Sequence, residues 1–215
     1  MTGAKQKRIP RSRTAAPDAD TEAKILAAAR RVFTAKGTAG ARMQDIAKEA
    51  GVNQALLHYY FRSKAALSER VFLEAAGRLV QIIPTAFRDS ATLEEMVTTF
   101  VHGYIDTVRE APFLPGYVLA ELHHDPTRIR TLVQRLSGRD PQAVVHQGLA
   151  RVQRLLGTRL NAEQFLLNLM ALSAFPFVAR PVLNGILGQD EAAFAAFLDE
   201  RRRTLPTFIL NAISR

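Results

Sequence analysis

The sequence predicts an all-α protein: an N-terminal three-helix head containing a helix-turn-helix, joined to a larger C-terminal helical bundle. Two observations predict this class. Apolar residues recur three and four positions apart through most of the chain, and no segment shows the alternating pattern of a strand over a useful length. With 215 residues, 47% of them hydrophobic, the chain is long enough for one large or two small domains with packed cores.

The first predicted helix follows an N-terminal basic arm. Residues 1–19 combine five Lys and Arg with Pro, Gly, Ala and Ser, a composition typical of disorder. Asp20 or Thr21 can cap the helix that comes next, and Gly37 can stop it. The apolar residues of this helix are Ile25, Leu26, Ala29, Val32 and Phe33. We expect the helix to pack on the two that follow and to close a three-helix unit.

Residues 42–61 have the pattern of two short helices joined by a glycine turn. Apolar residues of the first helix form one stripe, made of Met43, Ile46, Ala47 and Ala50. Gly51 is placed to adopt a left-handed turn, and Asn53 to cap the second helix. Leu57 and Phe61 turn inward, which leaves the opposite side of the second helix exposed. This is the pattern of a helix-turn-helix.

A longer helix should connect this head to the rest of the chain. Ser63 can cap a helix that begins at Lys64 and ends at Pro84. Its buried side would carry Leu67, Val71, Ala75, Leu79 and Ile82. Further helices are predicted at 93–109, 114–123, 126–136, 141–156, 162–187 and 191–213. The predicted division is a basic arm at 1–19, a helix-turn-helix domain at 20–66 and a C-terminal domain at 67–215.

Positive charge is concentrated in the N-terminal part of the chain. Residues 1–80 hold 15 Lys and Arg against 7 Asp and Glu, whereas residues 81–215 hold 14 against 13. Such a charge excess favours binding to nucleic-acid phosphates, because each neutralised phosphate releases counterions. The arm can follow the DNA backbone or enter the minor groove, or it can be no more than a solubilising tail.

The run DIAKEAGVNQALLHYYFRSK, residues 45–64, resembles the DNA-binding segment of the TetR family of bacterial transcriptional repressors. The shared features are an Ile-Ala pair, an Ala-Gly-Val turn, a stretch similar to Leu-Tyr-x-His-Phe, and a closing Ser-Lys. The likeness covers roughly residues 20–67 of this chain. It implies a ligand-responsive repressor that binds a palindromic DNA operator as a homodimer.

Three departures from the family pattern lie within or next to this run. Ala55 stands where the family often has Gly, and His58 and Tyr60 are exchanged relative to the usual order. Ala41 and Arg42 occupy the positions where Thr or Ser usually caps the first helix of the motif. The Thr or Ser that usually caps that helix is therefore missing from this sequence.

The resemblance implies that the second motif helix enters the major groove of DNA. Predicted base contacts are Gln44, Gln54, Ala55 and Leu56. Gln54 suits an adenine edge, and Ala55 or Leu56 suits a thymine methyl group. Predicted phosphate contacts, which set register without reading sequence, are Arg42, His58, Tyr59, Tyr60 and Lys64. For Tyr60, partial burial in the core of the head is the alternative.

The stretch 165–183 is the most apolar part of the C-terminal domain. A helix that is hydrophobic nearly all round must be covered on all sides, and a second copy of the chain can supply part of that cover. The resemblance also predicts dimerisation through the last two long helices. The predicted dimer residues are Phe177, Leu183, Phe194, Phe197, Leu198, Leu205 and Phe208. Burial within a single chain is the alternative.

A ligand pocket is predicted in the C-terminal domain, mainly from the resemblance. Its predicted lining is Phe100, Tyr104, Phe113, Tyr117, His146, Met170 and Phe175. The aromatic content favours a lipophilic effector, and a histidine can orient one hydrogen bond. Ordinary core packing is the alternative for each of these side chains.

No catalytic motif was found, so we expect neither an enzyme nor a cofactor. His123 and His124 diverge by about 100° on a helix and cannot face one metal ion. The chain has no cysteine. An apolar signal segment and a run of about 18 apolar residues are both absent from the sequence, so we expect a cytoplasmic protein without a membrane partner. The rival function is that of a sequence-tolerant architectural DNA-binding protein.

Overall fold

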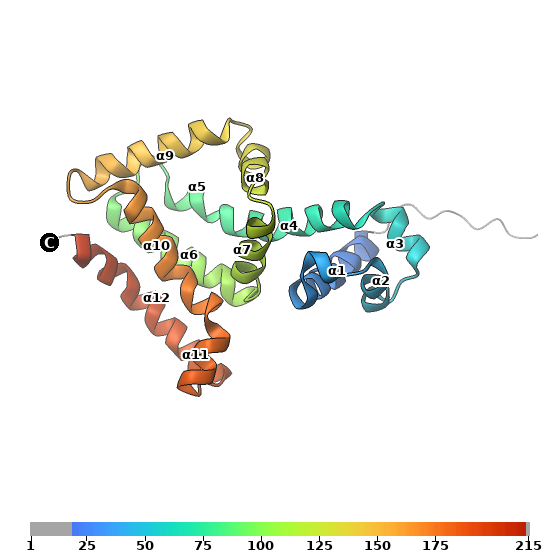
Figure 1. The fold of residues 1–215 in the computed structure, drawn as a ribbon. Helices are drawn as coiled ribbons and strands as arrows, with labels where there is room; N and C mark the ends of the chain where they lie inside the picture. Colours follow the sequence, from blue (N-terminus) through green and yellow to red (C-terminus); the bar gives the residue numbers. More distant parts are fainter. Residues whose placement is uncertain (1–18, 214–215) are drawn as a thin grey trace, which may run out of the picture.

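The computed structural model describes residues 19–213, which fold into twelve helices and no strand (Figure 1). A small head at one end contains α1 (Ala19–Gly40), α2 (Met43–Ala50) and α3 (Gln54–Tyr60). Helix α4 (Lys64–Val80) runs from this head into a larger body. The predicted fold class is therefore confirmed. The predicted basic arm, residues 1–19, lies outside the described residues except for Ala19.

The body contains the remaining eight helices. They are α5 (Ile82–Ala86), α6 (Leu93–Glu110), α7 (Leu114–His124), α8 (Arg128–Ser137), α9 (Pro141–Leu156), α10 (Ala162–Val178), α11 (Arg180–Leu187) and α12 (Glu191–Ile213). In Figure 1, α7 lies beside α4 on the side of the body that faces the head, whereas α12 lies at the far side. The body is thus joined to the head through α4 and α7.

The head and the body have separate hydrophobic cores. In the head, the buried side chains of α1 pack against Ile46, Leu57 and Phe61, as predicted. This core extends into α7 through Ala111, Leu114 and Tyr117. In the body, α6 packs against α5, α9, α10 and α12 around a second core. The core of the head is therefore continuous with Ala111 and with the first turn of α7 in the body.

Helix α4 is shorter than the sequence suggested. It ends at Val80, and Pro84 lies inside the separate helix α5 rather than ending α4. Proline is tolerated there because the first N–H groups of a helix have no intrahelical acceptor. The predicted single helix from Lys64 to Pro84 is therefore wrong at its C-terminal end.

The predicted helix 162–187 is divided into α10 and α11, which meet at an angle of 61°. The break lies at Ala179, two residues before Pro181. Proline has no N–H and so cannot continue the hydrogen-bond ladder of α10. Within residues 19–213, no single helix is long and apolar enough to span a membrane. Only α10 and α11 taken together have the necessary length and apolar composition, and they are bent relative to each other.

Two helices of the body carry a proline in their interior. Pro176 in α10 leaves the carbonyl of Leu172 without its helical donor, and the Arg201 side chain from α12 donates to it, at 2.5 Å from Nη2 and 3.2 Å from Nε. Pro206 in α12 frees the carbonyl of Arg202 in the same way. His102 of α6 donates to that carbonyl from Nε2, at 3.1 Å. Each proline is thus accommodated by a side chain from another helix.

Candidate nucleic-acid interface

The turn between α2 and α3 has the geometry that the sequence predicted. Gly51 adopts the left-handed conformation, with φ 69° and ψ 27°, and the Val52 N–H donates to the Ala47 carbonyl at 3.0 Å. Asn53 then caps α3, since its Oδ1 accepts from the Leu56 N–H at 2.8 Å. The turn and the cap together fix the direction in which α3 leaves the head.

Helix α3 presents one face to its core and the other to solvent. Leu57 is fully buried and Phe61 is nearly so. The opposite face is exposed and consists of Gln54, Ala55, Leu56, His58 and Tyr59. Tyr59 is 59% exposed, so its ring and hydroxyl are available for a contact outside the head. Gln44, a predicted base contact on α2, is also exposed.

Two ion pairs hold α2 against α1, and neither of them includes a residue of the exposed face of α3. Lys36 bonds Asp45 at 2.8 Å, and Arg31 bonds Glu49 at 2.7 Å. The hydrogen bond from Lys36 lowers the pKa of Asp45 below its usual range. These contacts fix the position of the motif helices relative to α1.

Two of the predicted phosphate contacts are partly used inside the head. The Lys64 ammonium donates to the carbonyls of Ala39 and Ala41, each at 3.1 Å, and so closes the turn between α1 and α2. Lys64 therefore has a structural role in the head, and its contact with phosphate stays a prediction. Tyr60 is half-buried and packs on the head core, with its ring edge-on to Tyr59 at 5.6 Å. The alternative of partial burial holds for Tyr60.

Arg42 and Arg62 are exposed basic residues at the two ends of the motif. Arg42 occupies the N-cap position of α2 and makes no side-chain cap. Arg62 lies in the turn between α3 and α4. Arg62 is not among the contacts predicted from the sequence, although its charge directly after α3 is a signal for one.

The predicted ligand-pocket residues do not come together in one place. Phe100 and Tyr104 stack at 6.0 Å inside the core of the body. Phe113 and Tyr117 belong to the core of the head instead. Two further members, Met170 and Phe175, are more than half exposed on α10. The prediction of one pocket lined by all these side chains is therefore wrong.

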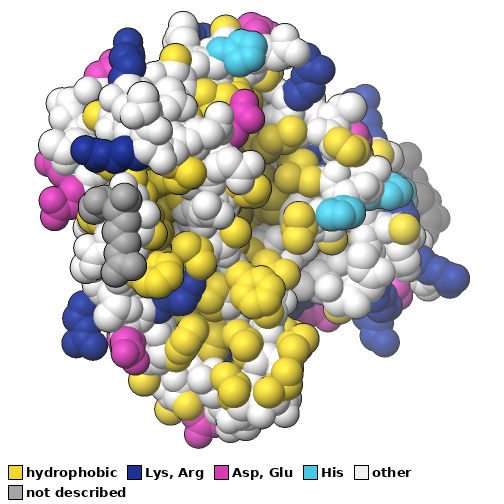
Figure 2. All heavy atoms as spheres, turned by 60° about the vertical axis from the view of Figure 1, so that its left-hand side comes forward, with side chains coloured by type: hydrophobic (Ala, Val, Ile, Leu, Met, Phe, Trp, Pro, Cys, Tyr) yellow, Lys and Arg dark blue, Asp and Glu magenta, His cyan; other side chains and the backbone are white. Residues whose placement is uncertain are grey.

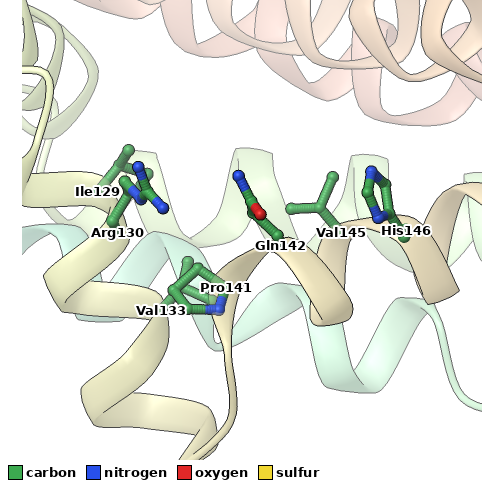
Figure 3. Close-up of a pocket in the computed structure, with 7 residues that line it drawn as sticks. All are labelled: Ile129, Arg130, Val133, Pro141, Gln142, Val145 and His146. Carbon is green, nitrogen blue, oxygen red and sulfur yellow. The ribbon is translucent and has the colours of Figure 1, made fainter.

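One predicted member, His146, does line a hollow between α8 and α9 (Figure 3). The hollow has a volume of about 300 Å³. Its lining consists of Ile129, Arg130, Val133, Pro141, Gln142, Val145 and His146. Figure 3 shows the side chains of Gln142, Val145 and His146 pointing to one side of α9. The lining is apolar apart from an amide, a guanidinium and an imidazole.

The predicted dimer residues also divide into two groups. Four of them lie in the core of the body itself, namely Phe177, Phe194, Leu198 and Leu205. Their burial within one chain corrects the prediction that they form a surface for a second copy. Leu183 and Phe197 are half-buried, and Phe208 is 62% exposed. The structure supports the alternative of burial within the chain for most of this set.

Other apolar side chains are exposed on the same helices. They are Leu167, Met170, Phe175 and Val178 on α10, Val182, Ile186 and Leu187 on α11, and Phe208 on α12. We call this set the apolar face of the body. Figure 2 shows hydrophobic side chains gathered over the centre and lower end of the side that contains these helices. A monomeric soluble protein rarely exposes so many large apolar side chains together.

The sequence pattern of bacterial regulatory proteins of the tetR family matches residues 25–71. These residues include α2, α3 and most of α1, the elements that form the exposed face described above. The chain is 26% identical to the probable HTH-type transcriptional regulator YttP of Bacillus subtilis, over 78% of this chain and 82% of the relative. It is 42% identical to the HTH-type transcriptional regulator EthR of Mycolicibacterium smegmatis, over 31% of this chain and 32% of that one.

Solved structures with the same fold cover nearly the whole chain. A transcriptional regulator of Streptomyces coelicolor, SCO4942, superposes with a TM-score of 0.64 at 18% identity, over 88% of this chain and 96% of the other. FadR of Bacillus subtilis, solved in complex with stearoyl-CoA, superposes with a TM-score of 0.59 at 15% identity, over 86% and 97%. With the helix-turn-helix geometry, these likenesses identify the chain as a DNA-binding transcriptional regulator, not an enzyme, whose head matches the tetR family and whose whole fold is similar to that of TetR-like regulators.

Proposed function

We propose that this protein is a homodimeric repressor that binds a palindromic operator and leaves it when a small molecule binds the body. The observation that carries the proposal is the exposed face of α3, which is held outward by the Gly51 turn and the Asn53 cap. A recognition helix in the major groove needs this arrangement, because its exposed side chains must reach base edges. The half-sites would lie about 10 base pairs apart, or a multiple of that.

The exposed residues of the head suit two kinds of DNA contact. Gln54 would pair with an adenine edge, and Ala55 or Leu56 would contact a thymine methyl group, while Gln44 is a second candidate for a base contact. Phosphates would be held by the basic and aromatic side chains around them, namely Arg42, His58, Tyr59, Tyr60, Arg62 and Lys64. The base contacts would give specificity and the phosphate contacts register.

The apolar face of the body supports the homodimer. Its side chains lie on three consecutive helices, and several of them are more exposed than hydrophobic side chains usually are, with Ile186 at 75% and Phe175 at 64%. A second copy related by a two-fold axis would cover this face with the same residues from the partner. The two heads would then be held at a fixed separation, as a palindromic operator requires.

The hollow between α8 and α9 supports a small-molecule effector. Its volume of about 300 Å³ is at the lower end of the range of ligand pockets. The apolar lining favours a lipophilic molecule, and Arg130 or His146 can bind a polar group at its end. The fold neighbour FadR, which was solved with stearoyl-CoA, shows that a lipophilic acyl compound is compatible with this fold.

Binding of the effector would lower the affinity for DNA, and binding of DNA would lower the affinity for the effector. If the effector favours a state in which the heads no longer match the half-site spacing, DNA must weaken effector binding by the same factor. Such couplings are typically about 5-fold to 150-fold.

The proposal is tested by selecting random duplex DNA on the purified protein at near-physiological salt and sequencing what is retained. Enrichment of one inverted repeat supports a specific dimeric regulator. Tight binding that enriches no sequence and disappears as salt rises would instead show the architectural DNA-binding protein. The selected repeat then serves as the probe in a screen for molecules that release the protein from DNA and restore transcription.

A further inference from the structure

A buried polar junction lies between the head and the body. It contains Glu121 of α7 and Arg128 of α8 on the body side, with Thr38 of α1 and Ser68 of α4 on the head side. Glu121 is 5% exposed and Ser68 is fully buried. Charged residues are rarely buried to this extent unless they are paired, so the contacts of Glu121 are informative.

The two charged residues form an ion pair within the body. Arg128 Nη1 lies 2.5 Å from Glu121 Oε2, and Arg128 Nε lies 3.8 Å from Asp125. The Arg128 guanidinium also lies over the ring of Phe72 on α4, at 5.2 Å from its centroid. The pair joins α7 to α8 and is pressed against α4, with 16% of the Arg128 side chain exposed.

Each member of the pair also bonds a hydroxyl outside α7 and α8, one on α1 of the head and one near the start of α4, which leaves the head. Thr38 Oγ1 donates to Glu121 Oε1 at 2.5 Å, and Arg128 Nη2 donates to Ser68 Oγ at 3.4 Å. Thr38 follows Gly37, where the backbone of α1 leaves helical geometry, with φ 69° and ψ 159°. The short turn after this break therefore brings the hydroxyl of α1 to the carboxylate of α7.

The surroundings of the junction strengthen these bonds. Tyr117 is buried beside it, and burial together with the negative charge of Glu121 raises the pKa of its hydroxyl above the usual value. Hydrogen bonds to ionised groups are stronger in such low-dielectric surroundings. They are also directional, whereas the apolar contacts of Leu114 with the head permit sliding. Rotation of the head would break a bond to a buried carboxylate and leave it with one partner fewer.

From these contacts we infer that Glu121 is a positioning residue, which with Arg128 fixes the orientation of the DNA-reading head on the body through Thr38 and Ser68. In the dimer, this orientation sets the half-site spacing that the two heads accept. The link to half-site spacing rests on the proposed function, whereas the role of Glu121 in orienting the head does not. Because Ile129, Arg130 and Val133 of α8 line the hollow beside α9, a ligand there acts on the helix that carries Arg128.

The inference is tested first without DNA and without the need for a dimer. The sequence has no cysteine, so Lys48→Cys in the head and Glu94→Cys in the body give two specific labelling sites, both exposed. Nitroxide labels on one chain, diluted into an excess of unlabelled protein, report the head-to-body distance by pulsed electron paramagnetic resonance. The wild-type background should give a narrow distance distribution.

Two variants detach the junction from the head and leave the ion pair in place: Thr38→Val, which keeps the shape of the side chain, and Ser68→Ala. We expect their combination to broaden the distance distribution, while thermal unfolding confirms that the chain is folded. Asp106→Asn is the matched control, because it breaks the Asp106–Arg202 ion pair between α6 and α12 at 2.9 Å without touching the head. A distribution as narrow as that of the control would overturn the inference.

The second measurement compares binding to the selected inverted repeat with its half-sites moved ~1–2 base pairs apart. The double variant should lose roughly threefold to tenfold in affinity for the preferred spacing, because fewer molecules hold the competent orientation, and should discriminate less between spacings. Broadened distances with an unchanged spacing preference would overturn the link to spacing. If the wild-type protein selects no repeat, the proposed function fails, and the distance measurement still decides the role of Glu121.

Discussion

The helix-turn-helix of the head is fixed by residues that adjoin its helices, whereas the two body helices with an interior proline are completed by side chains from distant parts of the chain. In the head, Gly51, Asn53 and Ser63 terminate or cap the helices that they adjoin. In the body, Arg201 and His102 satisfy carbonyls that two prolines free in other helices. The head is therefore specified by short-range sequence, and its motif can be recognised without the fold. In the body, α10 and α12 depend on contacts that exist only once the chain is folded.

The largest expected effect tests whether the two regions are separate folding units. Leu57→Ala removes a fully buried side chain from the head core, and we expect it to lower the free energy of unfolding by about 2–5 kcal/mol. Hydrogen exchange should show lost protection in α1, α2 and α3 while α6 and α12 stay protected, and DNA binding should be abolished.

Leu56→Ala is the matched control, because the same atoms are removed from a side chain that is 36% exposed. Its stability should change by less than about 0.5 kcal/mol. Equal loss of protection in head and body after Leu57→Ala would show that they unfold as one unit.

The next effect concerns the body alone. Arg201→Met removes the donor to the Leu172 carbonyl, and we expect a loss of about 1–3 kcal/mol in unfolding free energy, measured by denaturant titration. In a Pro176→Ala background the same substitution should cost less, because alanine returns an N–H to that carbonyl.

Arg203→Met, on the exposed side of the same helix, controls for the loss of a charge. If Arg201→Met costs as much with alanine at position 176 as with proline, Arg201 stabilises the body by some other contact.

A third test separates two kinds of residue within the head. Gln54→Ala should cost about 1–3 kcal/mol in operator binding and relax the preference at one base position, with binding to random DNA unchanged. Lys64→Met should instead lower the stability of the head, because the Ala39 and Ala41 carbonyls lose their donor. Binding to operators and their single-base variants, together with thermal unfolding of both variants, measures the difference. An equal loss on operator and random DNA for Gln54→Ala would remove it from the base contacts.

The smallest effect is the pH dependence of the contact between α1 and α2. The folded-state pKa of Asp45 is lowered from its ordinary value of 3.8, mainly by the hydrogen bond from Lys36. Its contribution to stability is therefore present above the unfolded pKa and is lost as the pH falls through the folded pKa. Asp45→Asn should be slightly less stable than wild type at neutral pH. The difference should disappear in strong acid, as denaturant titrations across pH would show; a difference that persists there would point to another role for Asp45.

Much of the head could be predicted from sequence, and the reasons are physical. The cap at Asn53, the left-handed Gly51 and the buried Leu57 all follow from rules that apply within one or two helical turns. Lys64 was assigned to phosphate because its structural acceptors, the carbonyls after the Gly37 break, belong to a turn whose position cannot be derived from spacing.

The body was predicted less well because periodicity shows which side of a helix is buried but not which element covers it. Phe113 and Tyr117 were predicted to line a ligand pocket in the C-terminal domain, yet they pack into the core of the head. Phe194 and Leu198 were expected to face a partner and instead lie in the core of their own chain. Proline positions misled as well, since Pro84 was expected to end the helix from Lys64 and instead lies in the first turn of α5. The predicted helix 162–187 also ran through Pro181, whereas the structure begins the separate helix α11 there.

The pairing of Pro176 with Arg201 has a consequence for how related sequences can diverge. A chain that replaces this proline restores the backbone donor to Leu172 and removes the need for a guanidinium 25 positions later. The two positions should therefore change together among homologues, although neither touches DNA or lines the hollow beside α9. The same covariation is expected between Pro206 and His102. A designer who wishes to make either helix regular must change both members of its pair.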